Sequence, residues 1–88
     1  MTAAFTQLSR IFGRDIAMPE SARAAIAAAP DVLANAFFAE AADSDDVTSV
    51  ESALDYLEGR LAFFVPLIDA QTAAIIRHAF RERLRAWE

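Results

Sequence analysis

The sequence predicts an all-α fold, a small bundle of four to five helices in one domain over residues 1–88. Apolar residues recur at intervals of three and four through most of the chain, and helix-capping residues stand where these patterns begin. No stretch alternates polar and apolar residues with the period of a strand. The composition agrees, because 21 of the 88 residues are Ala, the strongest helix former, and only two are Gly.

The first half of the chain predicts three short helices over residues 2–12, 19–28 and 30–42. Gly13 follows the first apolar pattern at the place where a left-handed C-terminal cap belongs. Pro19 and Pro30 each fit the first position of a helix, since a missing N–H costs nothing there. Ile16 and Met18 are expected to anchor the first connector to the core.

The second half predicts two longer helices over residues 48–65 and 69–87. Thr48 and Glu51 are expected to form a capping box, and Asp69 is expected to cap the last helix. The apolar seam of the longer run is formed by Val47, Val50, Leu54, Leu57, Leu61 and Phe64. Gly59 inside this run either allows another backbone to approach or is simply tolerated. Because the connection between the two helices is short, we expect an antiparallel C-terminal hairpin as the backbone of the bundle.

Charge is distributed unevenly along the chain. The net charge is −5, every basic residue is Arg, and residues 24–59 contain no basic residue at all. The acids of this stretch are Asp31, Glu40, Asp43, Asp45, Asp46, Glu51, Asp55 and Glu58. The last twelve residues, in contrast, carry a net charge of +2. Such polarity favours electrostatic recognition of a charged partner.

No catalytic, metal-binding or cofactor-binding motif is recognisable in the sequence. The chain has no Cys, and its single histidine, His78, forms with Glu82 an i, i+4 pair. Two ligands fall short of the three or four that a stable metal site requires. The acids of residues 43–46 do not fit a calcium-binding loop, which needs Gly and Glu at later positions that are occupied here by Thr48 and Leu54. The sequence therefore predicts a protein that is not an enzyme and uses neither metal nor cofactor.

Membrane and export signals are also missing from the sequence pattern. The longest apolar run has eight residues, 61–68, against the roughly 20 that span a bilayer. No basic flank followed by an apolar core begins the chain. We therefore expect a cytoplasmic protein without membrane contact.

Residues 47–56 resemble the last helix of acyl carrier proteins, a family of small, acidic, helical proteins. In that family an Asp-Ser-Leu motif at the start of the second helix receives the phosphopantetheine arm. This chain has Glu20, Ser21 and Ala22 at the matching offset, and Pro30 interrupts the helix that should follow. We therefore assign the resemblance to shared capping and amphipathic patterning and reject membership.

Three surfaces are candidate sites. The acidic candidate consists of Asp43, Asp45, Asp46, Glu51, Asp55 and Glu58. Tyr56 and Phe63 lie seven residues apart and off the apolar seam, which predicts surplus apolar surface on the same helix. A secondary candidate is the i, i+4, i+8 stripe of Arg77, Arg81 and Arg85, at the oppositely charged end of the chain. This stripe could contact phosphate or the acidic stretch of a second copy.

The most concrete functional hypothesis is a non-catalytic inhibitor. Its carboxylates would stand in for phosphates and occlude a basic nucleic-acid-binding surface of a larger protein. In character this is similar to anti-CRISPR and other small acidic anti-defence proteins. The alternative is a homo-oligomeric adaptor or regulatory module, a homodimer built on the surplus aromatic surface. A purely solubilising role for the acids stays open. Direct nucleic-acid binding is disfavoured, because the isoelectric point is about 4.7.

Overall fold

The computed structural model describes residues 3–87 and contains, within that range, helices and no strand. The α-helices are α1 (Ala3–Phe12), α2 (Pro19–Ala28), α3 (Pro30–Asp43), α4 (Val50–Phe63) and α5 (Ala70–Leu84). Two 3₁₀ turns follow the last two of them, η1 (Val65–Leu67) and η2 (Arg85–Trp87). The all-α prediction is thus confirmed, whereas the expected start of the first helix at Thr2 lies outside the described residues.

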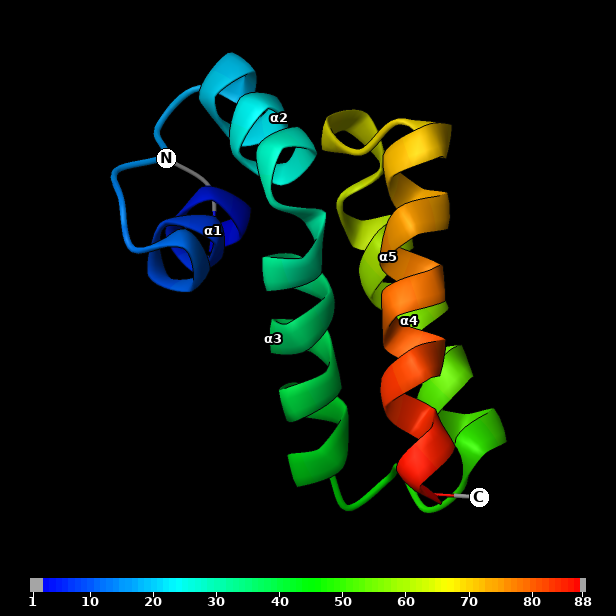
Figure 1. Cartoon of the computed structure of the whole chain (residues 1–88). Coiled ribbons are helices and arrows are strands. Elements are labelled where there is room, and N and C mark those ends of the chain that lie inside the picture. Colours follow the sequence, from blue (N-terminus) through cyan, green and yellow to red (C-terminus); the bar gives the residue numbers. More distant parts are fainter. Residues whose placement is uncertain (1–2, 88) are drawn as a thin grey trace.

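Helix α3 occupies the centre of the bundle. It packs on α1 and α2 near its start, on α4, and most extensively on α5, which lies beside it over much of its length (Figure 1). Small residues allow this central position, because Ala34 and Ala41 are buried alongside Leu33 and Phe37. Helices α4 and α5 also touch, but the hairpin that we expected as the backbone of the fold stays a prediction, since the dominant pairing of α5 is with α3.

A single apolar cluster connects the five helices. Its largest members are Phe37, Phe64 and Phe80, all fully buried, and the rings of Phe37 and Phe64 stack with centroids 6.0 Å apart. In α4 the buried side chains are Ala53, Leu57 and Leu61. Val50 and Leu54 are only partly buried, so the expected seam is rotated toward Ala53.

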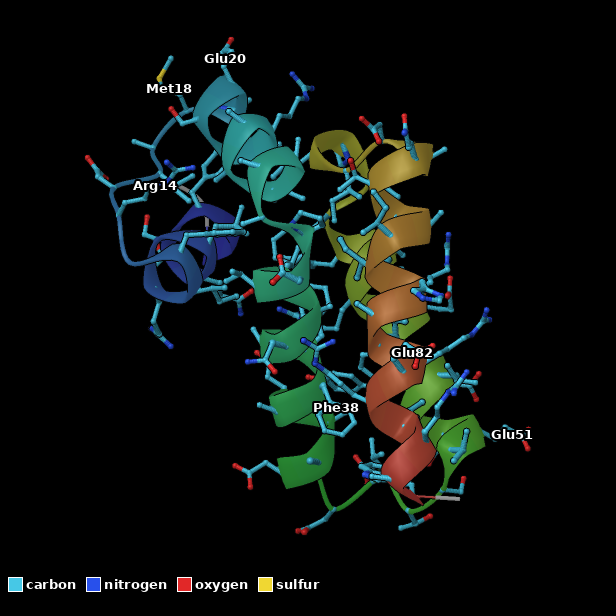
Figure 2. All side chains as sticks on the ribbon, viewed as in Figure 1. Arg14, Met18, Glu20, Phe38, Glu51 and Glu82 are labelled. Carbon is cyan, nitrogen blue, oxygen red and sulfur yellow. The ribbon has the colours of Figure 1, made fainter. Side chains whose placement is uncertain are left out.

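The first connector follows the expectation in part. Ile16 is fully buried, and its N–H donates a hydrogen bond to Ser9 Oγ at 2.9 Å. Gly13 has φ of +69° and its N–H donates to the Ser9 carbonyl, which confirms the left-handed cap. The expected anchoring of Met18 is wrong, because this residue is 57% exposed and points away from the bundle (Figure 2). Its extended backbone at the start of α2 directs the side chain outward.

Helix α4 begins one residue later than the capping box predicted. Ser49 is the N-cap: its Oγ accepts the N–H of Ser52 at 3.1 Å, and Ser52 Oγ accepts the N–H of Ser49 at 2.9 Å. The predicted box of Thr48 and Glu51 is therefore wrong, since two adjacent hydroxyl residues compete for the cap. The cap on α5 is confirmed, with Asp69 Oδ1 accepting the N–H of Thr72 at 2.7 Å.

The shifted cap leads to a stability prediction. Ser49→Ala should lower the free energy of unfolding by about 1 kcal/mol, because it removes the N-cap acceptor of α4. Thr48→Ala is the matched control and should change it by less than about 0.5 kcal/mol. Urea denaturation measures both. The reverse order of the two losses would restore the box that the sequence predicted.

Gly59 leads to a second prediction. It is exposed in the middle of α4, and a Cβ there would meet no neighbouring atom within 4 Å. Close approach of another backbone is therefore not its role in this fold. Gly59→Ala should raise the free energy of unfolding by about 0.5–1 kcal/mol through helix propensity and a less flexible unfolded chain. Destabilisation in urea denaturation would show that an unrecognised contact forms at this position.

Candidate functional site

The connection between α3 and α4 concentrates exposed carboxylates. Asp43 ends α3, and Asp45 and Asp46 follow in the loop. Glu51 lies in the first turn of α4 and points outward, and Asp55 follows one turn later (Figure 2). None of the five forms an ion pair with any of residues 3–87. We call this group, Asp43, Asp45, Asp46, Glu51 and Asp55, the acidic end.

Helix geometry makes part of this arrangement unfavourable for folding. The C-terminus of α3 carries the negative pole of the helix dipole, so anions close to it are destabilising. The last turn of α3 nevertheless contains Glu40 and Asp43 and no basic residue. In the loop, Ser44 Oγ accepts the N–H of Asp46 at 3.3 Å, which orders the backbone without neutralising any carboxylate.

Glu58 does not belong to this unpaired group. Its two carboxylate oxygens accept hydrogen bonds from Arg77 Nε and Nη2 at 2.8 and 2.9 Å, a bidentate pair between α4 and α5. These hydrogen bonds lower the pKa of Glu58 below its ordinary value of 4.5 and raise that of Arg77. The structure thus joins one residue of the acidic candidate to one residue of the arginine candidate.

This pair should make stability depend on pH. Because the pKa of Glu58 is lowered in the folded state, the pair stabilises the fold above pH 4.5, and this contribution is lost as the pH falls through the folded pKa. Both side chains are substantially exposed, so Glu58→Gln should cost less than about 1 kcal/mol at neutral pH. The difference between wild type and variant in thermal denaturation should shrink as the pH falls below 4.5 and Glu58 becomes protonated. A difference that is equal at neutral and at acidic pH would contradict this prediction.

The arginine stripe lies closer to the acidic end than its position in the chain indicated. Arg81 and Arg85 border a surface groove together with Val50 and Leu54, at the start of α4. Arg85 Nε is 3.3 Å from Glu82 Oε2. The other oxygen of this carboxylate, Glu82 Oε1, is 3.7 Å from His78 Nε2, which is the i, i+4 pair expected from the sequence. Arg81 has no ion-pair partner among the described residues.

The two aromatic candidates have different environments. Tyr56 is partly buried, and its hydroxyl donates a hydrogen bond to Glu40 Oε1 at 3.2 Å. Burial, and next the charge of Glu40, raise the pKa of Tyr56 above its ordinary 10.0. Phe63 leaves 51% of its surface exposed and packs edge-on against Phe64. Only Phe63 therefore matches the expected surplus apolar surface.

An arginine that the sequence did not single out holds this region together. The Arg60 guanidinium lies 5.3–5.5 Å from the ring centroids of Phe37, Phe63 and Phe64. Its Nη2 donates to Gln7 Oε1 at 2.8 Å, and its Nε lies 3.6 Å from Glu40 Oε1. Arg60 thus connects α1, α3 and α4. Its partners lie far apart in the sequence, so no local motif could have indicated the cluster.

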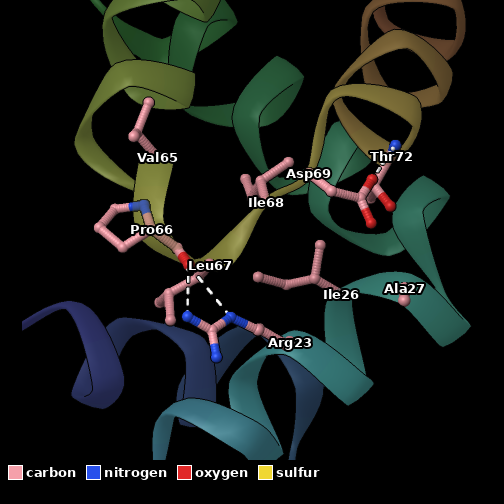
Figure 3. Close-up of a pocket in the computed structure, with 9 residues that line it drawn as sticks. All are labelled: Arg23, Ile26, Ala27, Val65, Pro66, Leu67, Ile68, Asp69 and Thr72. Carbon is pink, nitrogen blue, oxygen red and sulfur yellow. Dashed lines mark hydrogen bonds between the residues drawn. The ribbon is translucent and has the colours of Figure 1, made fainter.

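A cavity of about 250 Å³ lies between α2 and the turn that joins α4 to α5 (Figure 3). Arg23 projects into its wall and donates two hydrogen bonds, at 3.0 and 3.1 Å, to the carbonyl of Pro66. Asp69 caps α5 from the opposite wall. Because both charged groups already hold backbone atoms, the cavity presents mainly apolar side chains such as Ile26 and Leu67.

Residues 3–87 contain neither a cluster of metal ligands nor a single helix that could span a membrane. No three metal-ligating side chains lie together there. No single helix of that range is long and apolar enough to cross a bilayer; α2 and α3 pass by length and composition only when taken together, and the chain bends by 90° between them.

The fold and the acidic end thus describe a small helical bundle with an unpaired anionic surface. No protein-family model matches the chain, and neither a curated protein nor a solved structure matches it significantly.

Proposed function

We propose that this protein acts without catalysis and binds a basic surface of a larger protein through the acidic end. The observation that carries the proposal is the concentration of five exposed carboxylates without a cationic partner among the described residues. No ion pair within the described residues occupies these carboxylates, so they are available to a partner. A basic groove that normally holds phosphates would accept them, since arginine and lysine bind carboxylates and phosphates alike.

The position of the acids supports a role in binding rather than in solubility alone. A solubilising charge can stand anywhere on the surface. Asp43 instead stands at the C-terminal pole of α3, where the helix dipole opposes it, and no basic residue in that turn compensates. A charge kept at a destabilising position is typical of a functional surface.

The mechanism that follows is steric and electrostatic occlusion. The anionic field accelerates encounter with a cationic surface, and the rigid bundle then covers the site that nucleic acid would occupy. Loss of affinity with rising salt should accompany this mode of binding. Such a protein is an inhibitor of a nucleic-acid-binding partner, and it needs no catalytic group.

The alternative function, a homo-oligomeric adaptor, is supported by apolar residues at the other end of α4. Phe63 and Val65 leave 51% and 65% of their surface exposed. Phe63→Ser together with Val65→Ser would remove this patch with no change of charge. If that double variant loses partner binding while the acidic-end variants keep it, the adaptor function is supported and the inhibitor function is rejected.

Affinity capture with matched baits tests the proposal. Wild-type protein, an acidic-end variant (Asp43→Asn, Asp45→Asn, Asp46→Asn) and a control variant (Asp15→Asn, Glu20→Gln, Asp31→Asn) are used on extracts of the source cell. Both variants remove three negative charges from exposed positions, so only the location differs. We expect a nucleic-acid-binding protein to be retained by wild type and control and lost from the acidic-end variant. Equal retention by all three baits would reject the acidic end as the binding surface.

A further inference from the structure

Two separate surface hollows lie between α4 and α5, and we call them together the α4–α5 groove. Its lower part has a volume of about 480 Å³ and is bordered by Val50, Leu54, Arg81, Leu84 and Arg85. Its upper part, of about 190 Å³, is bordered by residues that include Leu61, Ala62, Val65 and Ile68. The Glu58–Arg77 pair also borders the upper part and ties the two helices together. The proposed function makes no use of the residues that line the two hollows, although Glu51 and Asp55 of the acidic end lie on the same helix.

Opposite charges stand on the two flanks of the groove. On α5 the flank carries Arg81 and Arg85, the second of which also pairs with Glu82 on the same helix. On α4 it carries Glu51 and Asp55, which do not line the hollows themselves. At 100° per residue Glu51 falls between Glu58 and Ala62, which both border the groove, and Asp55 falls about 20° beyond Ala62. Within the chain, no ion pair crosses the groove between these four residues. An apolar floor that includes Leu54 and Leu84 separates the two signs.

We propose that a second copy of this chain packs on the α4–α5 groove, about a two-fold axis parallel to the two helices. That rotation places the acidic α4 flank of one copy against the arginine α5 flank of the other, twice. A two-fold axis across the helices would place like charges together. Because a two-fold interface joins the same surface of both copies, a surface with opposite charges on its two sides is complementary to itself.

The charge pattern selects a second copy over other occupants. An acidic peptide would be attracted by Arg81 and Arg85 and repelled by Glu51 and Asp55, whereas a basic peptide would experience the reverse. A copy of the same face satisfies both flanks and brings Leu54 of each protomer toward the groove of the other. Like charges placed together disfavour every other register, so the charges set specificity as well as attraction.

The dimer leaves part of the acidic end open. Asp43, Asp45 and Asp46 lie in or beside the α3–α4 connection, beyond the start of the groove. An axis parallel to the helices keeps the two connections at the same end of the dimer, so their six carboxylates form one surface. This consequence rests on the proposed function, whereas the dimer itself does not.

A charge-swap experiment tests the dimer. Sedimentation equilibrium is measured on wild type, on an acidic variant (Arg81→Glu, Arg85→Glu) and on a basic variant (Glu51→Arg, Asp55→Arg). Each variant places like charges against each other in its own homodimer, so we expect its dimer dissociation constant to rise at least about tenfold. Mixed in equal amounts, the two variants have complementary faces and should form a heterodimer at least as tight as wild type. Circular dichroism checks that each variant keeps its helices.

The sedimentation results have the following consequences for the proposed dimer. Wild-type dimers that weaken in both variants and reappear in the mixture support the proposal. A wild type that stays monomeric from micromolar to submillimolar concentration overturns it, as does a dimer insensitive to the four substitutions. A mixture that remains monomeric overturns the proposal, because its two faces have opposite charges. Control reversals at Arg14 and Asp31, exposed and away from the groove, should leave the dimer unchanged. Because Asp43, Asp45 and Asp46 are untouched, failure of the dimer is distinguishable from failure of partner binding.

Discussion

Phe37→Ala should lower the free energy of unfolding by about 3–5 kcal/mol, as expected for truncation of a fully buried aromatic ring. Phe37 is fully buried on the central helix α3, stacks on Phe64 and lies beneath the Arg60 guanidinium. Its removal leaves a cavity between α3 and α4 that neighbouring rings cannot fill without leaving their own contacts. The total free energy of unfolding of a small domain is roughly 5 kcal/mol, so the variant should be largely unfolded at physiological temperature. Circular dichroism with thermal denaturation measures the loss.

Phe63→Ala is the matched control, because the same atoms are removed from a half-exposed site. Phe63 retains 51% exposure and contributes an edge-on contact with Phe64. Its truncation should cost about 1 kcal/mol, the value of an aromatic pair with limited burial. Similar losses for the two variants would place the core elsewhere than between α3 and α4.

The combined substitution of Asp43, Asp45 and Asp46 by Asn should weaken binding to the captured partner by at least about tenfold. Most of the change should appear in the association rate, because long-range attraction acts before contact is made. Folding should be unchanged or slightly more stable, since the substitutions remove anions from the C-terminal pole of α3. Surface plasmon resonance across a range of salt concentrations measures the rates.

The control variant at Asp15, Glu20 and Asp31 separates the effect of where the charges lie from the effect of the net charge of the protein. These residues are exposed and lie away from the α3–α4 connection, so their neutralisation should leave the association rate within about twofold of wild type. If the two variants lose affinity equally, net charge explains the binding and no dedicated surface is needed. High salt should abolish the difference between wild type and the acidic-end variant.

Local signals in the sequence were sufficient for the elements of this fold. Gly13, Pro19, Pro30 and Asp69 mark helix ends because their backbone or side-chain chemistry acts within one turn. Prediction was poorer where two local solutions compete. Thr48 and Ser49 are both able to cap α4, and a rotation of the helix by part of a turn exchanges Leu54 for Ala53 in the core.

The site depends on contacts between distant parts of the chain, and there the sequence was less informative. Arg77 and Glu58 are nineteen residues apart, and their pairing follows from how α4 and α5 pack rather than from any motif. The acids of the α3–α4 connection were identified correctly as exposed, because a short polar loop between helices has no way to bury them. Helix α3 takes the central place because small residues on several of its faces let other helices pack against it. A sequence pattern with one apolar stripe does not indicate such a helix.

Competition between this protein and nucleic acid for the captured partner is the most direct test of the proposed inhibition. Fluorescence anisotropy of a labelled oligonucleotide bound to the partner is followed while the protein is added. We expect wild type to release the oligonucleotide completely, and the Asp43, Asp45 and Asp46 variant to release little at the same concentration. A partner that binds this protein and its oligonucleotide simultaneously, with unchanged anisotropy, would contradict occlusion of a nucleic-acid-binding surface by the acidic end.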